Sequence, residues 1–205
     1  GSTYFNVAQY RLPEFQIELE PEATEVLQGD TIRVDLEARY FFGGAVNEAS
    51  VEYNVITGPY YFNYTGPGGY YDFADMNGDD PEVGYGSIIA SGTGVTDAQG
   101  RLSIEVPANL RGSIVSQRFT IEVVVTDESE QAVAGRVNVT VHQGEVYVGV
   151  RPAQYVGTAG RDTTLEFIAV DWNSQPVAGH DIDIEIVERR SAGGEDVADL
   201  RVRGS

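Results

Sequence analysis

Hydrophobic and polar residues alternate along most of this chain with a period of two. Between residues 32 and 38, the apolar Ile32, Val34, Leu36 and Ala38 alternate with charged residues. The same alternation runs through residues 15–19, 51–55, 102–106, 119–125 and 137–141. Because successive side chains of a strand point to opposite faces, this pattern predicts short antiparallel strands with one buried face. No stretch has the longer period of a convincing amphipathic helix, so the sequence predicts an all-β protein.

An internal repeat is visible when the chain is shifted by about 131 positions, which lays residues 15–56 over residues 146–187. Apolar positions then coincide in phase, and the punctuating residues coincide too: Pro21 with Pro152, Gly29 with Gly160, and Val46 with Val177. A slip of one residue would turn every side chain to the wrong face, so the matched phase is informative. The repeat predicts two domains of one type in tandem.

The alternation stops between residues 58 and 86, where an aromatic, glycine-rich run is followed by an acidic one. The aromatic residues are Tyr60, Tyr61, Phe62, Tyr64, Tyr70, Tyr71 and Phe73. They form a candidate patch for a partner, a glycan or a neighbouring domain, or they cover their own sheet. Packing against a neighbouring domain or the same domain is favoured, because exposed aromatic clusters are rare on soluble domains.

The acidic run raises the question of a calcium site. Its candidate ligands are Asp72, Asp75, Asn77, Asp79, Asp80 and Glu82. Asp75, Asn77 and Asp79 have the spacing of the first three ligands of a helix-loop-helix calcium loop. That motif fails, because Asp80 and Gly86 stand where it needs Gly and Glu. A looser carboxylate cage stays open, beside the simpler interpretation of a solvated loop tip, and no other cofactor is predicted.

Composition narrows the function classes. The formal net charge of −19 disfavours binding to nucleic acid or anionic membranes. The absence of Cys excludes thiol catalysis, disulfides and zinc-thiolate sites. No apolar run reaches membrane-spanning length and no signal peptide begins the chain, so we expect no membrane insertion. The two histidines, His142 and His180, have no partners in a catalytic motif, and the chain is not expected to be an enzyme.

Four segments resemble the alpha-2-macroglobulin family. Residues 5–15 are similar to its junction between successive macroglobulin domains, with Tyr10, Pro13 and Phe15 at the matching positions. Residues 38–46 and 171–179 are similar to its turn between the second and third strands, with Ala45 replacing the usual Pro in the first copy. Residues 92–102 resemble its Gly-x-x-x-Thr-Asp-x-x-Gly hairpin. The resemblance covers nearly the whole chain, and the insertion looks like one in bacterial members.

The resemblance implies tandem immunoglobulin/fibronectin-III-like antiparallel β-sandwiches, the macroglobulin domains. Residues 3–12 are expected to be the closing strand of a preceding domain. Residues 13–143 are expected to form one complete sandwich with the insertion at 58–86, and residues 144–205 the truncated start of the next. In that last part three strands are expected, up to about Val187, and the tail at residues 191–197 is expected to be a loop.

The resemblance also implies that this is a non-catalytic structural fragment from upstream of the bait region. The parent is then a bacterial-type, broad-spectrum protease inhibitor that entraps proteases in the periplasm or at the cell surface. The fragment's partners are the neighbouring domains, and those of the parent are proteases. The first alternative function is a calcium-dependent surface adhesion repeat. The second alternative is that the insertion itself is the protease bait. An enzyme is the third.

Overall fold

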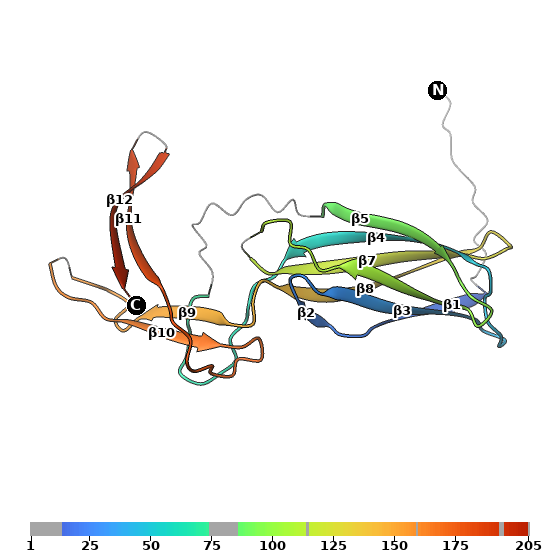
Figure 1. Ribbon diagram of the computed structural model, residues 1–205, viewed down its shortest axis with the longest axis horizontal. Coiled ribbons are helices and arrows are strands. Elements are labelled where there is room, and N and C mark those ends of the chain that lie inside the picture. The colour runs from blue at the N-terminus through green and yellow to red at the C-terminus, as the bar shows by residue number, and fades with distance from the viewer. Residues whose placement is uncertain (1–13, 74–85, 114, 159, 193–194, 205) are drawn as a thin grey trace, which may run out of the picture. The chain divides into compact units, whose positions relative to one another are not determined.

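The computed structural model describes residues 14–73, 86–113, 115–158, 160–192 and 195–204 (Figure 1). Within these ranges there are strands and no helix, and the predicted all-β class is confirmed. The chain divides into two compact units. Unit 1 consists of Gly1–Phe62 and Asp75–Glu145, and unit 2 consists of Asn63–Ala74 and Val146–Ser205. The expected closing strand at residues 3–12 lies outside the described residues.

Unit 1 is a sandwich of two sheets (Figure 1). The first sheet has the order β1-β3-β6, with β1 (Phe15–Pro21), β3 (Thr31–Tyr40) and β6 (Arg101–Pro107) all antiparallel. The second has the order β2-β8-β7-β4-β5, formed by β2 (Glu25–Leu27), β8 (Ala132–His142), β7 (Gln117–Thr126), β4 (Ser50–Pro59) and β5 (Ile88–Val95). Only the β2–β8 pair of this unit's described strands is parallel. Because β1 and β2 join different sheets, the start of the unit contributes to both layers.

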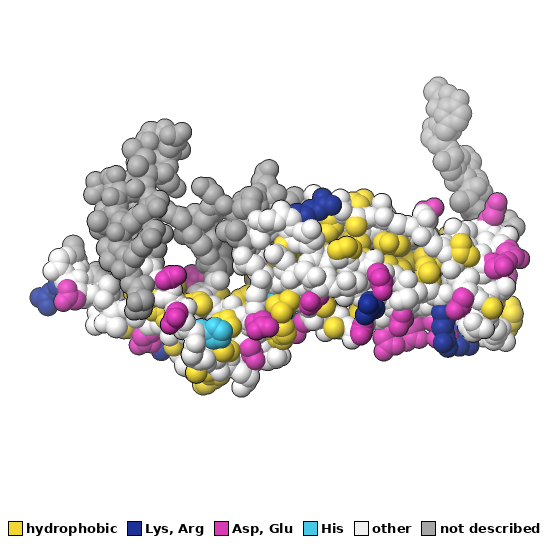
Figure 2. Space-filling model, in the orientation of Figure 1, with side chains coloured by type: hydrophobic (Ala, Val, Ile, Leu, Met, Phe, Trp, Pro, Cys, Tyr) yellow, Lys and Arg dark blue, Asp and Glu magenta, His cyan; other side chains and the backbone are white. Residues whose placement is uncertain are grey.

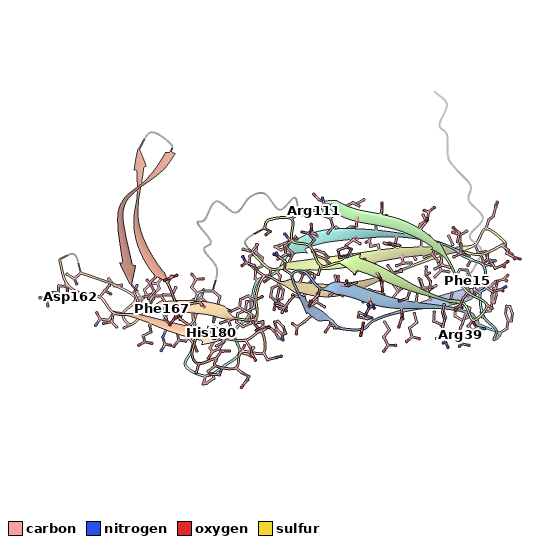
Figure 3. The ribbon with its side chains drawn as sticks, viewed as in Figure 1. Phe15, Arg39, Arg111, Asp162, Phe167 and His180 are labelled. Atoms are coloured by element: carbon pink, nitrogen blue, oxygen red, sulfur yellow. The ribbon has the colours of Figure 1, made fainter. Side chains whose placement is uncertain are left out.

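The core of unit 1 lies between its two sheets. The four apolar residues that open the sequence pattern, Ile32, Val34, Leu36 and Ala38, are all buried on β3. Phe15 on β1 points into the same core (Figure 3), and Phe119 on β7 is fully buried. The charged residues between them lie outside, where Arg33 pairs with Glu105 and Glu22. Acidic and arginine side chains accordingly lie beside one another along the β3 side of the unit (Figure 2).

Three turns share one local structure, which begins at Asp97, Asp127 and Asp171. In each, the aspartate Oδ1 accepts hydrogen bonds from the backbone N–H groups two and four residues later, at 2.8–2.9 Å. The fourth residue has a positive φ: 77° at Gly100, 60° at Glu130 and 63° at Ser174. This is the geometry of a tight turn whose fourth residue is left-handed, a conformation that suits glycine.

Glu130 therefore carries backbone strain that glycine would relieve. Glu130→Gly is expected to raise the free energy of unfolding of unit 1 by about 0.5–1 kcal/mol, after allowance for the extra entropy of glycine in the unfolded chain. Chemical denaturation followed by circular dichroism measures it. Glu128→Gly in the same turn is the control, since Glu128 has no positive φ. An equal shift in both variants would show that the left-handed backbone is not the cause.

The named strands described in unit 2 form two antiparallel pairs. One joins β9 (Tyr147–Pro152) to β10 (Leu165–Val170), and the other joins β11 (Ile184–Ala192) to β12 (Glu195–Gly204). The expectation of a loop at residues 191–197 is wrong for the residues described there, because β11 extends to Ala192 and β12 begins at Glu195.

The repeat is confirmed at the level of individual hydrogen bonds. The β1–β3 pair aligns Ile17 with Ala38, and the β9–β10 pair aligns residues 131 positions later, Val148 with Ala169. The turn that follows repeats as well: Arg39 bridges Ala45, and Val170 bridges Pro176. The same shift relates the bond from Val46 N–H to Ala38 O with that from Val177 N–H to Ala169 O. Residues shifted by 131 positions are therefore structurally equivalent in this region.

Candidate functional site

The aromatic segment, residues 63–73, is part of unit 2 although it lies in the sequence of the first repeat. It joins the free edge of β9 at one residue pair. Asp72 N–H donates to Val150 O and Val150 N–H donates to Asp72 O, both at 2.8 Å. The segment thus adds to the β9–β10 sheet as a short antiparallel strand, which satisfies backbone groups that an edge strand leaves unpaired.

Three aromatic rings of this segment pack on one another. Tyr64 meets the edge of Tyr71 with ring centroids 5.8 Å apart and an interplanar angle of 88°. It also packs against Phe73, with centroids 5.6 Å apart. Tyr64 Oη donates a hydrogen bond of 2.8 Å to Pro67 O, which closes the glycine-rich bend. Tyr71 and Phe73 flank Asp72 and point to the same side, as alternate residues of a strand do.

Arg151 of β9 holds the segment from the sheet side. Its guanidinium carbon lies 4.4 Å from the centroid of the Tyr71 ring, a cation–π arrangement. Its Nη1 donates to Gly68 O, and its Nε donates to Glu166 Oε2 on β10 at 2.7 Å. The bond to Glu166 fixes the guanidinium plane, so the arginine can present one face to the tyrosine and one donor to the bend.

Two further contacts depend on small side chains of the second repeat. Gly149 on β9 is buried under the Phe73 ring, and an added Cβ would lie 2.6 Å from that ring. Ser174 in the turn after β10 is only 3% exposed, and its Oγ accepts a 3.1 Å hydrogen bond from Thr65 N–H. The docking surface for the aromatic segment therefore consists of Gly149, Val150, Arg151 and Ser174.

The seven predicted aromatic residues are divided between the two units. Tyr64, Tyr71 and Phe73 come together in unit 2, whereas Tyr60 belongs to unit 1. Tyr61 and Tyr70 are exposed, and Phe62 is half-buried. Sequence reasoning missed the docking surface itself. A signal was available in the repeat, since the equivalents of Gly149 and Arg151 in the first copy are Glu18 and Glu20.

Tyr60 lies in a second cluster, inside unit 1, with His142 at the end of β8. The edge-to-face rings have centroids 5.5 Å apart, and the His142 Nε2 lies 3.6 Å from Glu25 Oε1. The imidazole is fully buried. Burial lowers the pKa of His142 below its ordinary 6.5, against an upward influence from Glu25. Burial also raises the pKa of Tyr60, and the Glu25 carboxylate adds to that rise.

This cluster predicts a pH dependence of stability. Because the pKa of His142 is lowered in the folded state, the unfolded chain binds more protons near and below pH 6.5. The histidine therefore makes the free energy of unfolding of unit 1 fall as the pH is lowered through 6.5. Replacing it, His142→Phe, is expected to flatten this part of the curve, measured by urea denaturation between pH 5 and 8.

The control is His180→Phe, because His180 is exposed in unit 2. It should leave the pH dependence of unit 1 unchanged. A curve for His142→Phe that parallels the original protein across the range would contradict the assignment.

The structure bears little on the calcium candidates. Asp72 lies in the segment that pairs with β9, whereas Asp75, Asn77, Asp79, Asp80 and Glu82 lie outside the described residues. Among the residues that the structure describes, no three His, Cys, Asp or Glu side chains are grouped so as to hold a metal ion. None of the described part of the chain forms a helix long and apolar enough to cross a membrane.

Comparison with known proteins connects this architecture to a family. No family model matches the chain. An alpha-2-macroglobulin of Thermotoga maritima is 27% identical over 179 residues, which is 86% of this chain and 10% of that protein. The predicted resemblance to the alpha-2-macroglobulins is confirmed. The chain spans about a tenth of the length of this relative.

Solved alpha-2-macroglobulins have the same fold. The native Escherichia coli protein matches 97% of this chain with a TM-score of 0.63 and 12% identity, over 14% of its own length. The trypsin-activated form of the E. coli protein matches 93% of the chain with a TM-score of 0.61 and the same 12% identity, over 14% of its length. A Salmonella alpha-2-macroglobulin variant matches 95% with a TM-score of 0.59, again at 12% identity and over 14% of its length. These matches extend over both macroglobulin-like repeats.

An exposed aromatic pair lies at the turn after β3 in the first macroglobulin-like repeat. Phe41 is 65% and Phe42 is 78% exposed, and Phe42 stacks on Tyr40 with centroids 5.0 Å apart. Phe41 N–H donates a 2.9 Å hydrogen bond to Glu14 O, so the pair lies where the chain enters β1. In the second repeat the equivalent turn contains Ser174, which the aromatic segment contacts.

Proposed function

We propose that this chain is a non-catalytic structural part of an alpha-2-macroglobulin-like protein that inhibits proteases by entrapping them. One observation carries the proposal: the sequence similarity and the shared fold both run across nearly the whole chain and cover only a small fraction of the relatives. Such a chain is a structural part of a larger protein. The E. coli relative has been solved in trypsin-activated and elastase-activated forms, which supports proteases as partners of the parent.

The scaffold is divided into consecutive macroglobulin domains. Residues 3–12 close a preceding domain, residues 13–143 form a complete domain with the insertion at 58–86, and residues 144–205 belong to the next. The repeat supports this division, because the β1–β3 ladder and the β9–β10 ladder are related by the same shift of 131 residues. The exposed Phe41 and Phe42, beside the entry of the chain, fit a surface for the preceding domain. Neighbouring domains are then the direct partners of this part of the protein.

A protein that entraps foreign proteases works outside the cytoplasm, so the parent belongs in the periplasm or at the cell surface. The strongly acidic composition, with a formal net charge of −19, keeps such a surface soluble. Fractionation of cells that express the parent with a tag at its C-terminus checks this location.

A protease-trapping assay tests the proposed function. The full-length parent is mixed with chymotrypsin, and the remaining activity is measured on casein and on a small chromogenic peptide. Entrapment predicts loss of casein cleavage with retention of peptide cleavage, because a cage excludes only the large substrate. Equal activity on both substrates, at the level of chymotrypsin alone, would overturn the inhibitor role. Heat-unfolded parent provides the control for simple competition by a degradable protein.

A further inference from the structure

We propose that residues 63–73 are a clasp, a segment carried by the first repeat whose dedicated partner is the β9 strand of the second. Gly149 and Arg151 select this partner, and the second repeat needs it for full stability. The inference rests on the repeat and on the contacts in unit 2. It does not depend on the protease-inhibitor role.

The two copies of the repeat differ at the positions that contact the clasp. Glu18 and Glu20 on β1 are exposed, and their equivalents on β9 are Gly149 and Arg151. Polar residues such as glutamate are usual at the outward-facing positions of a sheet with one solvated face. In the second copy the first glutamate is replaced by a glycine, which has no side chain, and the second is replaced by a positively charged arginine. Both changes fit the aromatic segment.

Each difference has a steric or electrostatic reason. A side chain at position 149 would collide with Phe73, since even a Cβ would lie 2.6 Å from the ring. An acidic residue at position 151 would lose the cation–π contact with Tyr71 and the hydrogen bond to Gly68 O. It would also face Glu166, the present partner of Arg151. A β9 strand with the β1 residues could therefore not accept this segment.

The same contacts define the kind of segment that the surface accepts. It needs aromatic residues at alternate positions, here Tyr71 and Phe73, around one residue that pairs by its backbone. It also needs a tight bend before them, here at Gly68 and Gly69 with φ of 100° and 89°, that turns a carbonyl toward Arg151. The backbone pair provides attachment, and the rings provide selectivity, as in other cases of strand addition.

Trp172 makes the second repeat separately observable, because it is the only tryptophan of the chain and lies in unit 2. Replacing both selecting residues with their counterparts, Gly149→Glu with Arg151→Glu, is expected to lower the unfolding midpoint reported by Trp172 fluorescence. Hydrogen exchange of the β9 and β10 amides should become at least about tenfold faster. The matched control is Glu18→Gly with Glu20→Arg in the first repeat, which should leave Trp172 and the β9 amides unchanged.

A milder pair of variants keeps the test decisive if the double replacement unfolds. Tyr71→Ala removes the ring under Arg151, whereas Tyr70→Ala removes a neighbouring ring that is 79% exposed. Only Tyr71→Ala should speed up β9 exchange. Equal behaviour of the two variants, or unchanged β9 protection in both, would overturn the clasp.

Replacement of residues 63–73 by a Gly/Ser segment of equal length tests the need for the clasp directly. We expect the Trp172 transition to shift to lower urea while the exchange of β3 and β7 amides in unit 1 stays as it was. A synthetic peptide of residues 60–73, added to this variant, should restore β9 protection, and a peptide with Tyr71 and Phe73 changed to Ala should not. An unshifted Trp172 transition, or equal rescue by both peptides, would show that the second repeat does not recognise this segment.

Discussion

Phe119→Ala is expected to lower the free energy of unfolding of unit 1 by about 3–5 kcal/mol. Phe119 is fully buried on β7, a central strand of the five-stranded sheet, and is among the largest buried side chains described. Its removal would forfeit the burial of the ring and leave a cavity in a close-packed core. Urea denaturation followed by circular dichroism and by hydrogen exchange of the β3 and β7 amides measures the loss.

Val124→Ala on the same strand is the control, because Val124 is 39% exposed on the outer face. It should cost less than about 1 kcal/mol. The unfolding of a domain with a typical net stability of about 5–15 kcal/mol would clearly register the difference. Similar losses in both variants would mean that the sheet does not face the core as described.

Gly100→Ala is expected to destabilise unit 1 by about 2–4 kcal/mol. Gly100 is the fourth residue of the turn that begins at Asp97 and has a φ of 77°. An added Cβ would lie 2.4 Å from Ala38 O and 3.1 Å from Val46 N, both backbone atoms. Because these atoms take part in the turn after β3, they cannot move aside without breaking hydrogen bonds. The shift in urea midpoint gives the loss.

Gly112→Ala separates the two causes. Gly112 also has a positive φ, 82°, but a Cβ there would meet nothing within 4 Å. Its replacement should therefore show only the cost of left-handed backbone, about 1–2 kcal/mol. If Gly100→Ala and Gly112→Ala lower the free energy of unfolding by the same amount, the close approach of Gly100 to the backbone of β3 does not contribute to the loss.

Phe119 and Gly100 belong to a β-framework whose strands were predicted well from the alternation of hydrophobic and polar residues. The buried faces of β3 and β7 follow directly from the period-two pattern, because a strand with one solvated face must alternate. The repeat was equally visible, since Pro and Gly mark turns and apolar positions mark faces. Its hydrogen-bond register then agrees with the sequence shift residue by residue. Short sequence patterns were sufficient to predict these features, because the faces of a strand and the position of a turn depend on residues that are close together in the sequence.

The strand after Val187 was missed for a related reason. A run such as Glu195 to Gly204 contains charged residues and few large apolar ones, so its pattern is close to that of a loop. Pairing with β11 supplies the backbone partners that make it a strand. Hydrogen bonds between segments are not encoded in the composition of either segment alone.

By itself, then, the sequence determined the all-β class, the phase of the strands, the tandem repeat and the resemblance to the alpha-2-macroglobulins. Only the tertiary structure decided which surface receives the aromatic segment. That surface combines Gly149 and Arg151 of β9 with Ser174 of a turn, and it pairs them with residues about 80–110 positions earlier in the chain. The aromatic pattern indicates that these rings pack against another surface, because the exposure of apolar rings to water is unfavourable. The surface on which they pack depends on the free edge of β9 and on the space above Gly149, and both exist only once the second repeat has folded.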